Sequence, residues 1–263
     1  MRPDTSSLEL LEKGALEIEG RLLTASNATF VGDIALDGVT ASCVYKPVRG
    51  ERPLWDFPDG TLANRERAAY LVSVATGHPL VPPTVLRDGP FGPGMCQLWI
   101  DEDPGHEMVD IVPAGALPAG WMHVLDAEDD HRHAVSLVHR DDPALQQMVV
   151  LDVVLNNADR KGGHVLVDEA GALYGVDHGV CFHREPKLRT VLWGWAGERL
   201  PDACEDAMRR LREELAGDLG AELADLLTDA EVRATCRRVD RLLAGAVFPT
   251  PSGHWPAIPW PAF

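Results

Sequence analysis

The sequence predicts an α+β fold in two lobes, with a strand-rich N-lobe over residues 1–101 and a helical C-lobe over residues 102–263. Three observations predict this arrangement. Strand-like segments separated by turn residues fill most of the first third of the chain, Asp, Glu, Pro and Gly dominate residues 101–120, and leucines recur at helical spacing after residue 200. We interpret residues 101–120 as the link between the lobes.

The N-lobe is predicted to hold antiparallel strands and one helix. Asp37-Gly38 is a strong signal for a two-residue hairpin. A helix is expected from about Leu62 to Thr76, because apolar residues supply one face and Gly77 follows as a C-cap. The expected strands cover residues 15–24, 29–36, 39–46, 81–87 and 95–100.

The C-lobe is predicted to be mainly helical. Asp142 as N-cap, with Pro143 in the first turn, indicates a helix that runs to about Asn156. A strand pair is expected at 165–167 and 173–176, and residues 201–246 have the pattern of helices. These signals complete the expected α+β chain.

Residues 127–140 contain three histidines close to Asp129 and Asp130. Their spacing matches no known set of metal ligands, so we interpret the stretch as a solvated insertion between helices. The segment 183–189 is locally basic, which fits either contact with an anionic molecule or a charge-mixed surface loop.

Composition limits the partners of the chain. Its 41 acidic and 24 basic residues give a net charge of −17, which repels nucleic acids and anionic lipid surfaces. No apolar stretch is long enough to cross a membrane, and the N-terminus lacks the pattern of a secretion signal. The five cysteines form no Cys-x-x-Cys pair. We therefore expect a cytoplasmic protein with reduced thiols and no nucleic-acid or membrane partner.

Two acidic motifs stand on either side of the predicted strand pair. The first is N-A-D-R-K-G-G-H, from Asn157 to His164, and the second is V-D-H-G, from Val176 to Gly179. They resemble the catalytic and metal-binding loops of type II phosphatidylinositol 4-kinases and HipA-like kinases. The sequence of the first motif is most similar to that of an actinobacterial group of small phosphatidylinositol 3-/4-kinase-like proteins. The resemblance implies a protein-kinase-like fold.

By this resemblance Asp159 corresponds to the catalytic carboxylate and Asp177 to the metal-binding one. Arg160 and Lys161 become candidates to neutralise charge during transfer. His164 stands where the families have Asn. An imidazole is a softer ligand than an amide oxygen, so either the site prefers manganese, or Asp177 alone binds the metal, or the site is weakened.

The resemblance also assigns residues of the N-lobe. Lys46, at the end of a predicted strand, corresponds to the lysine that holds the α- and β-phosphates of ATP, and Glu66 corresponds to its helix partner. The turn that contains Ser26 and Asn27 lies where a nucleotide-covering loop is expected, although it has no glycine run. A hairpin without ligand contacts is an equal alternative for this turn.

Residues 97–101 match the position of the hinge between kinase lobes. By that match the backbone of Trp99 and Ile100 would hold adenine, and an ordinary buried strand end is the alternative.

Together these assignments predict an ATP-dependent phosphotransferase that uses Mg²⁺ or Mn²⁺ and acts on a hydroxyl of a soluble protein or small molecule. Two alternatives remain open. The chain is otherwise a nucleotide-binding or partner-binding pseudokinase, or it transfers adenylate instead of phosphate.

Overall fold

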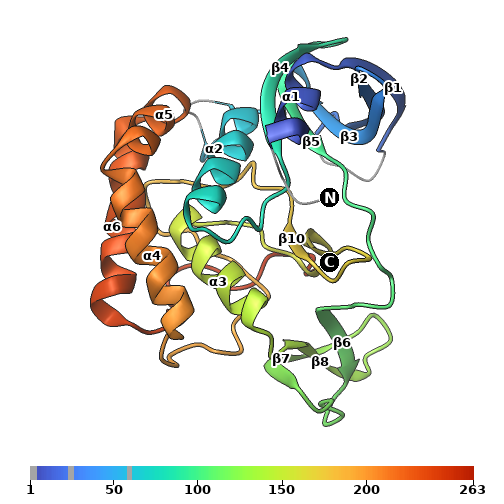
Figure 1. Cartoon of the computed structure of the whole chain (residues 1–263). Helices are drawn as coiled ribbons and strands as arrows, with labels where there is room; N and C mark the ends of the chain where they lie inside the picture. Colours follow the sequence, from blue (N-terminus) through green and yellow to red (C-terminus); the bar gives the residue numbers. More distant parts are fainter. Residues whose placement is uncertain (1–4, 23–26, 58–60) are drawn as a thin grey trace.

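The computed structural model describes residues 5–22, 27–57 and 61–263. A five-stranded antiparallel sheet of order β1-β2-β3-β5-β4 forms one part, and helices α3 to α6 form the other main part (Figure 1). The strands are β1 (Ala15–Arg21), β2 (Phe30–Leu36), β3 (Val39–Pro47), β4 (Thr84–Gly89) and β5 (Gly92–Leu98). The α+β organisation is therefore confirmed, whereas the lobe boundary after residue 101 stays a prediction.

The hairpin between β2 and β3 closes at Asp37 and Gly38, as the sequence predicts. Both residues have positive φ angles, 50° and 81°, which a two-residue type I′ turn requires. Leu36 pairs with Val39 directly across this turn. The turn therefore fixes the register of the two strands that precede the site described below.

Strand β3 presents alternate side chains to opposite faces of the sheet. Cys43 is fully buried, in the same cluster as Leu10 of α1 (Thr5–Lys13). Ser42 and Lys46 lie at alternate positions on the other face. Helix α1 was not predicted, because it is only nine residues long and its apolar positions span little more than one turn.

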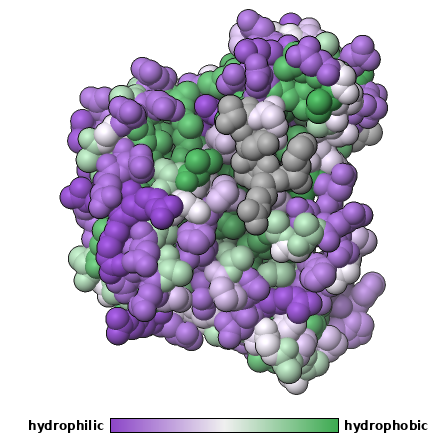
Figure 2. All heavy atoms as spheres, in the orientation of Figure 1, coloured by the Kyte–Doolittle hydropathy of each residue, from purple (hydrophilic) through white to green (hydrophobic). Residues whose placement is uncertain are grey.

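The helical part consists of α3 (Pro143–Leu155), α4 (Asp202–Leu215), α5 (Asp218–Leu226) and α6 (Asp229–Gly245). Asp142 caps α3 by accepting from the backbone N–H groups of Ala144 and Leu145. Leu211 of α4 and Leu223 of α5 are fully buried in a shared apolar core. The helices expected over 142–156 and 201–246 are confirmed. Helices α4 to α6 show a largely hydrophilic outer face (Figure 2).

Helix α2 (Leu62–Ala75) connects the sheet to the helical part. Its N-cap is Thr61, and the predicted Gly77 follows it with a φ of 81°. Arg65 pairs with Glu231 of α6 at 2.7 Å, and both side chains are almost completely buried. The helix that bears Glu66 is thus anchored to α6 by a buried ion pair.

The stretch between β5 and α3 differs from the prediction. It contains the strands β6 (Val109–Pro113), β7 (Trp121–Glu128) and β8 (Ala134–Arg140), which form a sheet of order β6-β8-β7. Residues 127–140 therefore comprise the end of β7, a largely exposed connection and all of β8, so the expected placement between helices is wrong. His139 is fully buried and its Nε2 accepts from the N–H of Gly194 at 3.0 Å. The strands were not predicted because the acidic composition of the stretch indicated a loop more strongly than its short alternating segments indicated strands.

A smaller hairpin consists of β9 (Val165–Val167) and β10 (Leu173–Gly175) and directly follows the 3₁₀ turn η2 (Gly162–His164). Another 3₁₀ turn, η1 (Val48–Gly50), follows β3. The end of the chain returns to η2, and in Figure 1 it lies close to β10. The Gly162 N–H donates to the Ala262 carbonyl at 2.8 Å, and the ring of Phe263 lies against Gly162. Within the described ranges, no helix combines the length and apolar character needed to cross a membrane.

Candidate active site

Lys46 lies between two carboxylates. Its Nζ is 2.8 Å from Oε1 of Glu66 and 2.8 Å from Oδ1 of Asp177. Burial opposes the charge on Lys46, but the carboxylates of Asp177 and Glu66 outweigh burial and raise the lysine pKa above its usual value. The Lys46 charge in turn holds the pKa of Asp177 well below its usual range. At neutral pH Lys46 is therefore a cation beside the Asp177 anion, and Glu66 is its second partner.

Glu66 also fixes the loop that follows β10. Its second oxygen, Oε2, accepts from the backbone N–H of His178 at 2.9 Å. Asp177, the residue before, has a φ of 61°, which is unusual for a residue other than glycine. Its side chain nevertheless remains 53% exposed. The loop is held so that the Asp177 carboxylate faces solvent beside Lys46.

A buried polar network around Arg160 holds the loop that contains Asp177. Nε and Nη2 of Arg160 donate to the two oxygens of Asp152, each at 2.9 Å, and both side chains are fully buried. Nη1 donates to the carbonyls of His164 and Val176, and Nη2 lies 2.6 Å from Nε2 of His178. Burial and the neighbouring Arg160 charge keep the pKa of His178 well below its usual range, so its Nε2 accepts.

This network changes the interpretation of one predicted residue. Arg160 was a candidate to neutralise charge on a transferred group, but its guanidinium is enclosed and bonded to Asp152. The arrangement favours an organising role. Asp152 was not among the predicted residues, because an acidic residue within an apolar helix carries no signal of what it contacts.

Asp159 is part of the loop that follows α3. Its backbone N–H donates to Oδ1 of Asn157 at 3.0 Å, which fixes the turn. Nζ of Lys161 lies 3.7 Å from Oδ2 of Asp159. Burial raises the pKa of Asp159 above the usual value, with the charge of Lys161 opposing the shift. The carboxyl is therefore a stronger base than an exposed aspartate.

His164 faces the same region. Its Nε2 is 3.6 Å from Oδ2 of Asp177, a separation that a single cation can bridge. Burial lowers the pKa of His164 to about 4, so the ring is neutral at pH 7 and has a free lone pair. Nδ1 is buried and has no hydrogen-bond partner among the described residues. The described part of the chain has no cluster of three or more His, Cys, Asp or Glu side chains suited to a metal. Any metal ligands beyond His164 and Asp177 would therefore not come from a preformed set of His, Cys, Asp or Glu side chains in that part of the chain.

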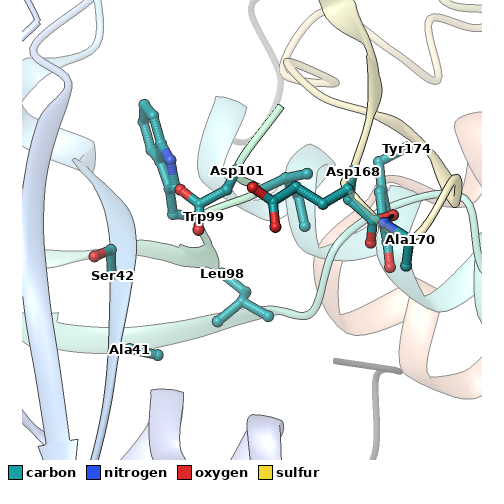
Figure 3. Close-up of a pocket in the computed structure, with 10 residues that line it drawn as sticks. Ala41, Ser42, Leu98, Trp99, Asp101, Asp168, Ala170 and Tyr174 are labelled. Atoms are coloured by element: carbon teal, nitrogen blue, oxygen red, sulfur yellow. Dashed lines mark hydrogen bonds between the residues drawn. The ribbon is translucent and has the colours of Figure 1, made fainter. Parts of the chain in front are cut away.

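A cavity of about 480 Å³ is lined by residues of β3, the end of β5 and the β9–β10 hairpin (Figure 3). The predicted hinge residues Trp99 and Ile100 line it, together with Ser42 of β3 and Tyr174 of β10. Its volume is within the range of about 300–1,000 Å³ that small-molecule sites occupy. The remaining lining residues are Ala41, Leu98, Asp101, Asp168, Glu169 and Ala170.

The cavity is joined to the charged residues by two chain segments. Ser42 and Lys46 lie on the same face of β3, four residues or about 13 Å apart. On the opposite side Tyr174 lines the cavity and Asp177 follows three residues later. Both segments thus run from the cavity to the cluster of charges.

Of the two predicted turn residues, Asn27 lies among the described residues and contacts a neighbouring loop. Ser26 lies outside the described residues. Oδ1 of Asn27 accepts from the backbone N–H of Arg52 at 2.9 Å, so this side chain holds a neighbouring loop. Its assignment to nucleotide binding stays a prediction.

The family described as phosphatidylinositol 3- and 4-kinase matches residues 144–219, which include most of α3 together with Asp159 and Asp177. Among solved structures, the Golgi casein kinase with Mn/ADP bound has a TM-score of 0.58 at 13% identity, over 92% of this chain and 74% of the other. A hydra Fam20 structure with sugar has a TM-score of 0.56 at 13% identity, over 94% and 89%. The protein-kinase-like fold is thereby confirmed.

A relative from Mycobacterium tuberculosis, Protein Rv2133c, is 51% identical over 97% of this chain and 94% of its own length. That similarity extends through both the sheet and the helical part. The chain therefore belongs to an actinobacterial family of phosphatidylinositol 3-/4-kinase-like proteins.

Proposed function

We propose that the chain is an ATP-dependent phosphotransferase that acts on a hydroxyl of a soluble protein or small-molecule acceptor. The observation that carries the proposal is the Lys46 ammonium, held 2.8 Å from both Glu66 and Asp177. Phosphoryl transfer requires little covalent chemistry from the protein and depends on charges held in fixed positions. Three elements far apart in sequence supply these charges.

The nucleotide is proposed to extend from the cavity to Lys46. The cavity, lined by Trp99 and Ile100, would take the base. An ammonium group has three N–H donors, of which Glu66 and Asp177 occupy two. The third remains for a phosphate oxygen. The distance of about 13 Å along β3 suits an elongated ligand with its charged end at Lys46.

Asp177 and His164 are proposed to hold the divalent cation, which would offset charge on the phosphates when bound. The 3.6 Å between Oδ2 of Asp177 and Nε2 of His164, together with the unprotonated ring, supports this assignment. Imidazole nitrogen suits manganese better than magnesium. The Golgi casein kinase structure, which shares the fold, has Mn and ADP bound.

The metal assignment predicts the effect of His164→Asn. The amide oxygen is a harder ligand, so the variant should gain activity with Mg²⁺ relative to Mn²⁺, by roughly tenfold in the ratio. Nucleotide-dependent thermal stabilisation with each metal gives a second readout. His106→Asn, at an exposed histidine that pairs with Asp103, is the matched control. An unchanged metal ratio in His164→Asn would remove this residue from the proposed ligands.

Asp159 is proposed to orient the acceptor hydroxyl and to accept its proton, because burial makes this carboxyl more basic. Lys161, 3.7 Å away, is proposed to offset the charge that develops during transfer. The net charge of −17 supports a soluble acceptor over an anionic membrane surface.

Labelled ATP tests the proposed reaction. Label at the γ position should reach protein or small-molecule acceptors, and label at the α position should not. Asp159→Asn should lower transfer by roughly 10²–10⁴-fold and retain nucleotide binding. Asp130→Asn, at an exposed aspartate of the β7–β8 connection, should leave transfer unchanged. Transfer of the α label would indicate adenylylation, and nucleotide binding without any transfer would indicate a pseudokinase.

A further inference from the structure

A second cavity lies on the helical part, between the C-terminal ends of α3 and α6 and the segments 186–193 and 247–255. Its volume is about 340 Å³, within the range of small-molecule sites. Leu188, Trp193 and Leu242 supply apolar surface, and Arg238 and Arg241 supply two cations. It shares no lining residue with the cavity beside Trp99.

The charged residues that line this cavity are all cations. No Asp or Glu is among the described residues that line it, although the whole chain carries 41 acidic residues. Neither Arg238 nor Arg241 forms an ion pair with a carboxylate within the described part of the chain. Two guanidinium groups without counter-charges beside an apolar wall are suited to an anion with an apolar body.

Arg238 donates to the backbone carbonyls of Val154 and His183, whereas a third donor of the lining has no partner among the residues that the structure describes. Nε1 of Trp255 is buried, and it has no hydrogen-bond acceptor in the part of the chain that is described. A buried N–H without an acceptor costs about 1–3 kcal/mol, so an oxygen-rich ligand within reach of it would be favoured. Lys187 stacks on the same indole ring, with Nζ 4.3 Å from the ring centroid. This ammonium is paired with Oδ2 of Asp56 at 3.0 Å, so Trp255 contributes an unpaired N–H donor, whereas the charge of Lys187 is already matched by a carboxylate.

From this arrangement we propose that the cavity is a binding site for a phosphate monoester with a small apolar body. The phosphate lies at Arg238 and Arg241, and the body lies against Leu188, Trp193 and Leu242. A dianionic phosphate matches two planar guanidinium groups better than a single carboxylate does. The site is separate from the proposed phosphotransfer centre, and its occupancy does not require turnover.

The cavity adjoins the loop that leads into the candidate active site. Asn156, in the lining, donates from Nδ2 to the carbonyls of His183 and Glu185, and its Oδ1 accepts from the N–H of Lys187. The guanidinium of Arg238 donates to the His183 carbonyl as well. Asn156 directly precedes the Asn157 side chain that fixes the backbone at Asp159. A ligand at Arg238 thus contacts the basic segment 183–189 that the sequence singled out.

The proposal is tested by calorimetric binding of 1-naphthyl phosphate, with 1-naphthol and inorganic phosphate as separate probes. The full chain is kept saturated with Mn²⁺ and ADP, so that the phosphate probe does not report on the Lys46 site. We expect 1-naphthyl phosphate to bind at least about tenfold more tightly than either of the other probes. If 1-naphthol or inorganic phosphate binds as tightly as 1-naphthyl phosphate, the proposal that the site recognises both a phosphate and an apolar body is overturned.

Matched arginine variants localise the binding. Arg241→Gln should weaken 1-naphthyl phosphate by about tenfold or more, because it removes a cation from the lining. Arg237→Gln removes an equal charge from an exposed residue of the same helix that does not line the cavity, and it should bind as the unmodified chain does. Equal affinities for the two variants, or no binding of 1-naphthyl phosphate at millimolar concentration, overturns the proposal. Neither result bears on transfer from ATP, which depends on other residues.

Discussion

The buried pair of Asp152 and Arg160 permits a sharp test of what holds the candidate active site together. Asp152→Asn keeps the shape of the side chain and removes its charge. Arg160, which is fully buried, would then keep its positive charge without a counter-ion. Breaking a buried ion pair from one side costs about 3–5 kcal/mol.

The structure refines this magnitude. Asp152 accepts two bonds from Arg160 and one from Nδ2 of Asn157, so the carboxylate serves three donors. An amide offers one oxygen in place of two, and its NH₂ group faces a cation. The carbonyls of His164 and Val176 still accept from Arg160, which limits the loss. We therefore expect about 3 kcal/mol, near the lower end of the range.

The assay is unfolding in urea, with the free energy of unfolding extrapolated to water and the melting midpoint as a second measure. A loss of about 3 kcal/mol should lower the midpoint by roughly 6–12 °C in a chain of this size. Asp240→Asn is the control, because it breaks an ion pair with Arg212 in which both side chains are about half exposed. That change should cost less than about 1 kcal/mol. If the two variants are equally stable, the network below the site contributes no more than a surface pair and the reasoning fails.

Two further predictions concern the loop from residue 159 to residue 163. Lys161→Met removes the charge that opposes the raised pKa of Asp159, so this pKa should rise further. The acidic limb of the pH profile of kcat/KM should then move to higher pH. An acidic limb that stays in place would contradict the assignment of Asp159 as base. Gly162→Ala would place a Cβ 2.3 Å from the ring of Phe263 and should loosen residues 257–263, which hydrogen exchange of that segment would report as faster exchange. Gly163→Ala meets nothing within 4 Å and should leave the exchange rates unchanged.

The parts of the fold that were predictable are those with local signals. Asp37-Gly38 closes a hairpin because its two residues accept positive φ, and Asp142 begins a helix because its side chain caps free N–H groups. Strand β6 was missed because it pairs with β8 across 20 or more residues, such as Val109 with His139. Strands β7 and β8 form a local hairpin, with Glu128 opposite Ala134, and were missed although their pairing is short-range. Acidic residues and prolines in that stretch gave a stronger loop signal than the short alternating runs.

The candidate site shows the same division. The resemblance named Lys46, Glu66 and Asp177, and the structure brings these three together within 2.8 Å contacts. The sequence placed Arg160 with them because it stands beside Asp159, but neighbouring residues in a loop point in different directions. Asp152, which determines where Arg160 points, lies eight residues earlier in a helix. Partners of buried charges are set by tertiary packing, which no local pattern encodes.

The anchoring of α2 has a consequence for the charges around Lys46. Arg65 ties this helix to Glu231 of α6, while the next residue, Glu66, contacts Lys46 on one side and the loop after Asp177 on the other. A helix held at adjacent residues by both parts of the molecule has little freedom to swing away. The lysine–glutamate contact is consequently supported from both the sheet and the helical part. A substitution that loosens α2 at Arg65 would therefore also disturb the charges around Lys46.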